Sequence, residues 1–330
     1  MRSKISKIAN YSPERVVTNI EVEDKVNLFG EYLPSGVLEK KFGVRERRYA
    51  RDEDQCSDLA AGAGFKILES VGRNEIDCLL FASGGTDLIE PATCNIVQSK
   101  LQLSCPAIDV KNACNSFVCG LQIADSFIKS ETYKKILIVT GEKVSTIIKY
   151  HPIDKLDLIN RMAGLSMGDA GAAALIEATE EDNGLIAQKF KTYGEHWNLC
   201  TIPGGGSMYP RDPDKVYFEG QTRELRDVFL SKGFSIFSEV LNEAEWNLDE
   251  IDHFFMHHVS ASTFEMIATL IGVDPDKFYN VIAKHGNMAA ASIPFAMASA
   301  VEEGKLKKGD KIMLIGLASG ISMSVQVMVW

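Results

Sequence analysis

Residues 74–83 read NEIDCLLFAS, and residues 249–258 read DEIDHFFMHH. Each stretch places Glu-Ile-Asp directly before a short apolar run that polar or small residues close, which is typical of a buried β-strand. KKILIVTGE (134–142) and GDKIMLIGLASG (309–320) form a second pair of the same kind. The offset is 175 residues for the first pair and 176 for the second. These near-equal offsets indicate an internal repeat.

The segments that precede these strands also correspond. SDLAAGAGFKILES (57–70) and GFSIFSEVLNEAEW (233–246) carry apolar residues three and four apart, as amphipathic helices do. Strands that alternate with helices predict an α/β fold with mostly parallel sheets. The repeat predicts two halves about a pseudo-twofold axis, residues 1–175 and residues 176–330. The alternative is a generic α/β protein in which two apolar strands match by coincidence.

Bulk composition narrows the class of protein. The chain has 330 residues, 45% of them hydrophobic, and a net charge of -10, which argues against a general nucleic-acid binder. No apolar run approaches the roughly 20 residues of a membrane span, and the N-terminal residues are charged and polar, so we expect neither a span nor a signal peptide. The seven cysteines are scattered, which fits a reducing compartment and predicts a cytoplasmic protein.

One cysteine has a physical reason to react. In IDVKNACNSFVCGLQIADSFI (108–128) a strand end is followed by apolar residues at helical spacing, so Cys114 is predicted at or next to a helix N-terminus. Unpaired N–H groups and the helix dipole stabilise an anion there, and we expect them to lower the pKa of the Cys114 thiol. Cys114 is the candidate nucleophile. The competing interpretation is a small residue that fits a tight turn.

Two further segments add polar groups. His257 and His258 follow directly on a predicted buried strand, and ligands of α/β sheets gather at such strand ends. Successive side chains diverge, so only one of the two histidines can point into a given pocket. Asn287, in KHGNMAAASIP (284–294), is either a helix cap or a donor aimed into the same cavity, since its segment is the repeat counterpart of the Cys114 segment.

Five motifs together resemble ketoacyl synthase III and its relatives in the thiolase superfamily. In chain order they are NACNSF, GDAGAAAL, MHHVS, GNMAAASIP and GLASGIS, and the resemblance runs from KFGVRERRYA (41–50) to Trp330. It implies a five-layered αβαβα sandwich, a homodimer, and an acyltransferase of fatty acid or polyketide biosynthesis. It also implies that no metal or resident cofactor is needed. The histidines agree, because no clustered carboxylates or cysteines accompany them.

The resemblance also implies roles for individual residues. Cys114 corresponds to the acyl-accepting cysteine, His257 to the catalytic histidine and Asn287 to the family's asparagine. The backbone N–H groups of Cys114 and Ser319 would form the oxyanion hole. The substrates would be thioesters of coenzyme A or of acyl carrier protein, joined by a Claisen condensation that uses a malonyl or an acyl thioester as the second partner.

Several positions depart from the family's pattern. Val37 and Lys41 stand where ketoacyl synthase III has a tryptophan and an arginine that grip coenzyme A, whereas Arg161 matches another coenzyme-A-contacting arginine. Lys41 and Arg161 are therefore the candidate contacts for coenzyme A or phosphopantetheine. Ser262 replaces a basic residue implicated in carrier-protein docking, which leaves open whether donors arrive on coenzyme A or on a carrier protein.

Glu90, in TDLIEPATC (86–94), is a further departure. Ketoacyl synthase III commonly has an apolar residue here that reaches into the partner subunit's tunnel. The head-to-head acyl-CoA condensing enzymes that make olefin precursors carry a glutamate before proline, which acts as a base on the α-carbon of the thioester. Glu90 is thus a candidate base for a non-decarboxylative route, and the alternative is a surface carboxylate in a turn.

Three functions remain open on the sequence. The first is condensation of two acyl thioesters, and the second is acyl transfer to a hydroxyl or an amine. The third is a scaffold or carrier-binding subunit without activity. Asn287 favours condensation over acyl transfer, and the intact set of Cys114, His257 and Asn287 argues against a scaffold.

Overall fold

The computed structural model describes residues 2–27, 33–232 and 234–330. The first half of the chain builds a five-stranded sheet with the strand order β1-β7-β6-β4-β5. β4 lies between β5 and β6 and is parallel to both, while β7 runs antiparallel to β6 and to β1. The strands are β1 (Arg2–Tyr11), β4 (Cys78–Ala82), β5 (Ala107–Val110), β6 (Lys135–Glu142) and β7 (Ala170–Thr179).

The second half repeats this arrangement. Its sheet has the order β11-β12-β13-β8, with β11 parallel to β12 and the other pairs antiparallel. A single parallel bridge joins Phe254 to Phe278 on the far side of β11, where the first sheet has β5. The strands are β8 (Gly184–Thr192), β11 (His253–Met256), β12 (Lys311–Ala318) and β13 (Ser322–Val329).

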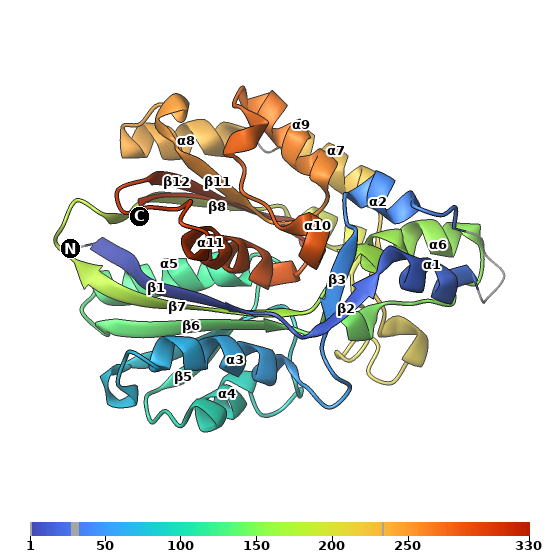
Figure 1. The fold of residues 1–330 in the computed structure, drawn as a ribbon, viewed down its shortest axis with the longest axis horizontal. Helices are drawn as coiled ribbons and strands as arrows, with labels where there is room; N and C mark the ends of the chain where they lie inside the picture. The colour runs from blue at the N-terminus through green and yellow to red at the C-terminus, as the bar shows by residue number, and fades with distance from the viewer. Residues whose placement is uncertain (1, 28–32, 233) are drawn as a thin grey trace.

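Helices cover the sheets in layers (Figure 1). One pair lies between the sheets, a second packs on the outer face of the first sheet, and a third covers the second sheet, which gives the αβαβα sandwich that the resemblance implied. The central pair is α5 (Ser116–Lys129) and α11 (Ser292–Glu302), and the outer pairs are α3 (Cys56–Leu68) with α4 (Thr93–Leu101) and α8 (Ser235–Ala244) with α9 (Ala261–Ile271).

The predicted repeat is confirmed element by element. β4 and β11 fall on the first pair of predicted strands, and β6 and β12 fall on the second. α3 and α8 form where the sequence predicts amphipathic helices. Apolar residues of both sheets and of α5 and α11 pack into one core, so the two halves share an interior.

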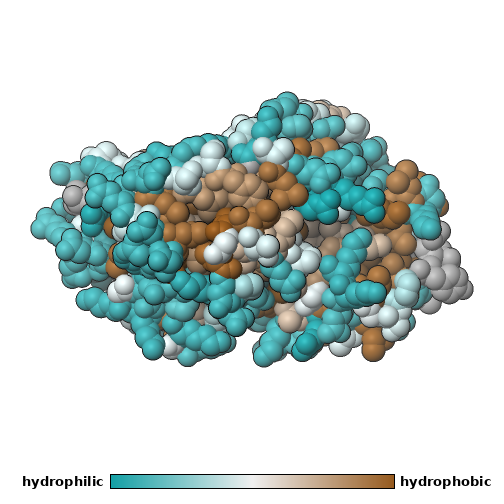
Figure 2. Space-filling view, turned by 90° about the horizontal axis from the view of Figure 1, so that it is seen from above, coloured by the Kyte–Doolittle hydropathy of each residue, from teal (hydrophilic) through white to brown (hydrophobic). Residues whose placement is uncertain are grey.

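Further elements complete the fold. They are α1 (Asn19–Asn27), α2 (Val37–Phe42), β2 (Arg15–Thr18), β3 (Glu46–Tyr49), α6 (Lys155–Arg161), β9 (Cys200–Thr201), β10 (Glu219–Gly220), α7 (Thr222–Lys232), α10 (Ile282–His285) and the short 3-10 turns η3 (Met162–Ser166) and η8 (Ala289–Ala291). Among them, α1, α2, β2, β3 and α6 gather at one end of the molecule (Figure 1). Figure 2 shows hydrophobic surface at this end of the molecule. Three exposed apolar residues lie on or next to α1 and α6, namely Ile20, Ile153 and Leu156, with exposed fractions of 66%, 81% and 65%.

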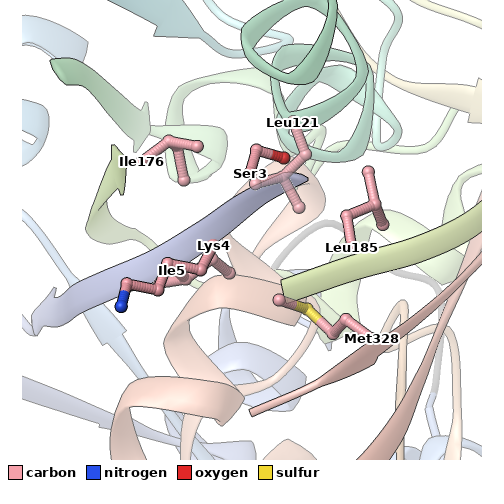
Figure 3. Close-up of a pocket in the computed structure, with 7 residues that line it drawn as sticks. All are labelled: Ser3, Lys4, Ile5, Leu121, Ile176, Leu185 and Met328. Atoms are coloured by element: carbon pink, nitrogen blue, oxygen red, sulfur yellow. The ribbon is translucent and has the colours of Figure 1, made fainter. Parts of the chain in front are cut away.

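The chain passes from the first sheet to the second between the end of β7 at Thr179 and the start of β8 at Gly184. The division at 175 and 176 stays a prediction. A cavity of about 10 Å³ lies in the seam between the halves, lined by residues that include Ile5, Leu121 and Met328 (Figure 3). It has room for about one water molecule, and none of the predicted site residues lines it.

Candidate active site

Cys114 lies in a tight turn between β5 and α5. Ala113 adopts a left-handed backbone conformation with φ of +47°, which is unusual for a residue with a Cβ and is the kind of strain that functional sites hold. The hydroxyl of Ser116 accepts a hydrogen bond from the Asn112 amide at 2.8 Å and donates one to the Ala113 carbonyl at 2.7 Å. This turn places Cys114 two residues before the helix, as the sequence predicts.

The second half contains the same turn, 176 residues later. Ala289 has φ of +46°, and the Ser292 hydroxyl at the start of α11 accepts a hydrogen bond from the Met288 amide at 3.2 Å. The counterpart of Cys114 in this turn is Ala290. The repeat therefore extends to the backbone of the nucleophile's turn, while only the first copy carries a thiol.

Hydrogen bonds connect the turn of Cys114 to the second half of the chain. Asn115 donates from Nδ2 to the carbonyl and hydroxyl oxygens of Ser322 at 3.1 and 3.2 Å, and Asn112 donates to the same hydroxyl at 3.1 Å. Gly316 on β12 allows this approach, because a Cβ there would lie 2.2 Å from Asn115 Oδ1. Ser319 lies in the connection between β12 and β13, three residues before Ser322.

His257 follows the last residue of β11, and its backbone amide donates to Ile315 on β12 at 3.0 Å. The side chain is buried, and within the described residues its Nδ1 has no hydrogen-bond partner. Burial lowers the pKa of the His257 imidazole to about 4, although the backbone at Ala289 acts in the opposite direction. The ring is therefore neutral at physiological pH, and one of its nitrogens can donate while the other accepts.

His258 is committed to the backbone. Its Nε2 accepts a hydrogen bond from the Val281 amide at 3.0 Å, so its Nδ1 carries the proton and donates to the Met256 carbonyl at 2.9 Å. These two bonds leave the ring no free nitrogen for a substrate. Of the two adjacent histidines, His257 alone keeps an unpartnered ring nitrogen.

Asn287 does not cap α11, which begins five residues later at Ser292, but its side chain accepts from the first residue of the short 3-10 turn η8, Ala289. Its backbone bonds to Ser166 and Gly168 at 3.0 Å each, and its Oδ1 accepts from the Ala289 amide at 2.9 Å. Because the oxygen is engaged in this turn, the amino group of the side chain is the part that can donate to a substrate. This agrees with the interpretation of Asn287 as a donor.

Two groups of contacts bring the segments together. The backbone of Ala289 contacts two of the site residues. It acts to raise the pKa of His257, and its amide donates a hydrogen bond to the side chain of Asn287. Glu142, at the end of β6, borders Ala290 through its backbone and acts electrostatically on Cys114. The segments of Cys114, His257 and Asn287 therefore converge on one region between the halves.

The expected protonation of Cys114 is wrong. Burial raises the pKa of its thiol well above the ordinary value, and Cys200 and Glu142 add to the rise, while the Cys114 backbone amide acts against it. Desolvation of the thiolate outweighs the helix N-terminus. The thiol is neutral at physiological pH, and the residue's exposure is intermediate.

Glu90 lies on the surface of this chain. It is exposed, next to Leu88 and Ile89, which are 52% and 84% exposed. Asp109 on β5 holds the following helix by accepting from the Thr93 and Cys94 amides at 3.0 and 2.7 Å. Glu90 therefore does not enter the interior of its own chain.

Arg161 and Lys41 lie near each other but differ in their partners. Arg161 is buried and paired with Asp157 at 2.5 Å and with Glu219 at 3.5 Å. Lys41 is exposed, and its Nζ donates to the thioether of Met162 at 3.0 Å. Burial and the nearby Arg223 lower the pKa of the Lys41 amine. The two carboxylates beside Arg161 leave it little positive charge for a ligand, whereas no carboxylate pairs with Lys41 in the described residues.

Comparison with known proteins decides the family. The family models described as 3-oxoacyl-[acyl-carrier-protein (ACP)] synthase III and its C-terminal part match residues 108–194 and 241–330, together more than half of the chain. A beta-ketoacyl-[acyl-carrier-protein] synthase III from Ehrlichia canis is 31% identical over 97% of each chain. The chain belongs to the ketoacyl synthase III family. It is therefore a condensing enzyme of the acyltransferase class.

Other relatives in and around the ketoacyl synthase III family agree. The synthase III of Fusobacterium nucleatum is 29% identical over 97% of this chain and 96% of its own. The solved structure of the synthase III from Aquifex aeolicus has a TM-score of 0.87 at 26% identity and covers 99% of this chain and 100% of its own. A variant of OleA from Xanthomonas campestris, solved with bound lauric acid and lauroyl-CoA, has a TM-score of 0.90 at 26% identity and covers 100% and 99%.

Two residues that act on Cys114 were not predicted from the sequence, namely Glu142 and Cys200. Glu142 ends a predicted buried strand, so its place at a strand end was a usable signal. Cys200 lies on β9, far from any motif, and no sequence signal places it near Cys114. Within the described residues no group of three or more His, Cys, Asp or Glu could hold a metal ion, and none of the helices is long and apolar enough to cross a bilayer.

Proposed function

We propose that this enzyme joins two acyl thioesters and that Cys114 carries the first acyl group. The observation that supports this most is the convergence of two copies of one turn, the Cys114 turn and the Ala289–Ala291 turn, on a region that also holds His257. A thiol, an imidazole and a carboxamide from distant parts of the chain then serve one site.

Acylation starts from a neutral thiol. The Cys114 sulfur attacks the thioester carbonyl, a C–S bond forms, and the proton of the thiol passes through the neutral His257 ring to the departing thiol. The tetrahedral oxyanion takes hydrogen bonds from the backbone N–H groups of Cys114 and Ser319. The products are an acyl-enzyme and a free thiol.

Condensation uses His257 a second time, together with Asn287. The carbonyl of the second thioester accepts hydrogen bonds from the Asn287 amino group and from an N–H of His257, which stabilise the enolate as it develops. Loss of CO₂ from a malonyl thioester is one source of this carbanion. The carbanion attacks the acyl group, a C–C bond forms, and Cys114 is released.

The position of Glu90 favours a second way to form the carbanion, which is removal of an α-proton from an acyl thioester. In a homodimer the exposed loop of Leu88, Ile89 and Glu90 would be covered by the other copy, and the free edge of β5, where Ile108 is 39% exposed, lies in the same half. Glu90 of one copy would then remove an α-proton in the site of the other. The likeness to OleA with bound lauroyl-CoA supports this head-to-head route and a donor on coenzyme A.

The proposal also covers the group that carries the acyl thioester, the oligomeric state and the cellular compartment. Lys41, at the apolar end of the molecule, is better placed than the ion-paired Arg161 to meet a phosphate of coenzyme A or of phosphopantetheine on an acyl carrier protein. The proposal needs no metal or resident cofactor and includes a cytoplasmic homodimer. The division of the chain into functional halves is also proposed, with Cys114 in the first and His257 and Asn287 in the second.

Acyl transfer to a hydroxyl or an amine is the competing function. It would need no enolate and hence no donor from Asn287, whereas the turn at Ala289 fixes this amide with its amino group available. Condensation uses this arrangement, and simple acyl transfer does not.

Product analysis tests the proposal. The enzyme is incubated with lauroyl-CoA alone, with lauroyl-CoA and malonyl-CoA, and with the corresponding carrier-protein thioesters, and the products are identified by mass spectrometry. A β-keto product with CO₂ release supports decarboxylative condensation, and one from lauroyl-CoA alone supports the head-to-head route. Ester or amide products, or no product with any donor, contradict condensation.

A further inference from the structure

Glu142 is a buried carboxylate at the C-terminal end of β6, with 1% of its surface exposed. Its Oε1 accepts a hydrogen bond from the Gly84 amide at 2.6 Å, and its Oε2 accepts one from the Gly85 amide at 3.2 Å. No lysine or arginine of the described residues forms an ion pair with it. Both oxygens act as acceptors of backbone amides, which is the arrangement that suits an ionised carboxylate.

The carboxylate lies against the turn of the nucleophile. A Cβ on Gly84 would lie 3.4 Å from Glu142 Oε1 and 3.7 Å from the carbonyl carbon of Ala113, so Gly84 is held between the two. Gly84 and Gly85 also begin the loop that ends at Glu90. One side chain thus touches the residues that lead to both Cys114 and Glu90.

Glu142 also reaches the second half. Burial raises the pKa of its carboxyl, and hydrogen bonds from the Gly84 amide, the Ser83 side chain, the Gly85 amide and, in the second half, the Ala290 backbone act against this rise. β6 packs on η8, so the contact is not limited to one atom. Ala290 is the repeat counterpart of Cys114 and lies three residues from Asn287.

We propose that Glu142 is a positioning residue, whose carboxylate holds the turn of Cys114 and the turn next to Asn287 in place and anchors the start of the loop that leads to Glu90. The inference rests on the proposed function and deepens it. It carries an electrostatic consequence, because the ionised form of Glu142, which its two amide donors favour, disfavours the thiolate form of Cys114. Glu142 then has two separable effects, one of shape and one of charge.

The charge effect depends on the other titratable groups around Glu142 and Cys114. Burial is the main cause of the raised pKa of Cys114, and none of the tested substitutions changes it much. The titratable groups around the cluster are Cys56 of α3, Asp87, Asp169 next to β7 and Cys200 of β9.

Three variants separate the effects. Glu142→Gln keeps the length of the side chain but removes the charge and one acceptor, and Glu142→Asp keeps the charge but loses the reach to both amides. Asp125→Asn is the matched control, since Asp125 is a buried carboxylate on α5 that bonds to Ser3 and Lys129, away from this cluster. Folding of each variant is checked by circular dichroism.

Two readouts are measured, the rate of Cys114 alkylation by iodoacetamide at pH 8, followed by peptide mass spectrometry, and the rate of condensation. Only the thiolate reacts, so a fall of about one unit in the thiol's pKa makes alkylation about tenfold faster. We expect this gain in Glu142→Gln with a condensation rate at least about tenfold lower. Glu142→Asp should lose condensation without faster alkylation, and Asp125→Asn should change neither rate.

An unchanged alkylation rate in Glu142→Gln overturns the proposal, whatever happens to condensation. If that variant does not fold, Glu142→Asp decides, and a normal condensation rate in it overturns the proposal. Alkylation needs no acyl substrate. A wild-type enzyme that condenses nothing would therefore defeat the proposed function and still leave the alkylation test of Glu142 readable.

Discussion

At the scale of residues, burial sets the pKa values of the reacting side chains in opposite directions. It raises the pKa of the Cys114 thiol and lowers that of the His257 imidazole to about 4. Both groups are therefore neutral in the free enzyme, in contrast to a preformed thiolate and imidazolium. A neutral pair avoids two buried charges and makes proton transfer part of the acylation step.

His257→Ala and Asn287→Ala test the division of labour between the residues. Both residues are assigned to the enolate, so condensation should fall by about two orders of magnitude or more in each variant, which corresponds to losing one oxyanion-type donor. Asn287→Ala should leave the amount of acyl-enzyme unchanged, since that residue is not needed for the first step. Quantifying the acyl-enzyme by intact mass and the product by chromatography checks this, and a normal condensation rate in Asn287→Ala would contradict the assignment.

The substitution His258→Gln tests how His258, a buried neutral histidine whose two ring nitrogens bond to the backbone, affects stability. Burial is the main reason why the pKa of His258 falls to about 3 in the folded protein, compared with 6.5 in an unfolded chain. Unfolding then takes up a proton below pH 6.5, so this residue destabilises the fold as the pH falls from 6.5 toward 3. Glutamine can replace both hydrogen bonds, to Met256 and from Val281, without titrating.

We therefore expect the stability of His258→Gln to match the wild type at pH 8 and to exceed it between pH 6 and pH 4, with the difference growing by about 1.4 kcal/mol per pH unit. Urea denaturation at a series of pH values measures this. A constant difference across the series would mean that His258 does not titrate with unfolding.

At the scale of elements, the repeated turn before α5 and α11 organises the site. Each copy has a left-handed alanine and a serine hydroxyl that accepts a backbone amide, and only the first copy carries a thiol. The turn of the first half contacts β13, and the turn of the second half contacts β6. The site thus forms where each half receives a turn from the other.

Ser116→Ala and Ser292→Ala form a matched pair on this turn. Each removes one hydroxyl that accepts a backbone amide, so each should lower the free energy of unfolding by about 1 kcal/mol. Their kinetic effects should differ. Ser116→Ala loosens the Cys114 turn and should slow acylation several-fold, while Ser292→Ala should slow condensation and spare acylation. Denaturation and single-turnover kinetics report both, and identical kinetic effects would contradict the separate roles of the turns.

Much of this arrangement could be predicted from the sequence, because it follows from local patterns. The strand pairs, the amphipathic helices and the position of Cys114 before α5 depend on periodicity and chain order. The neutral state of Cys114 could not be predicted, because desolvation and the helix N-terminus oppose each other and packing decides which is larger. The contacts of Glu142 and Cys200 and the ion pair of Arg161 with Glu219 likewise result from packing between segments far apart in the sequence.

At the scale of the whole molecule, β5 is an edge strand of its sheet among the described residues and the loop of Glu90 is exposed, so the proposed head-to-head route would need a second chain. Glu90 is exposed, and Ile89 beside it is 84% exposed. A second copy would bury this apolar surface and receive the carboxylate. The proposed head-to-head site is therefore built from two chains.

Complementation tests this assembly. Cys114→Ala and Glu90→Gln should each be inactive alone in head-to-head condensation, and Glu90→Gln should still form the acyl-enzyme. Mixed by unfolding and refolding together, they should regain activity, because a heterodimer contains one site with an intact Cys114 and a Glu90 from the other chain. Random pairing gives one competent site in four, so recovery should approach about a quarter of the wild-type rate. No recovery in a mixture shown to contain heterodimers would exclude Glu90 acting between subunits.

The most direct test of the central claim is the mass of the enzyme after exposure to an acyl-CoA. The account predicts that the wild-type chain gains the mass of one acyl group, that the group maps to the peptide containing Cys114, and that a malonyl or second acyl thioester removes it as a longer keto product. Cys114→Ala should gain nothing. An acyl group on another residue, or an adduct that persists in Cys114→Ala, would contradict the account.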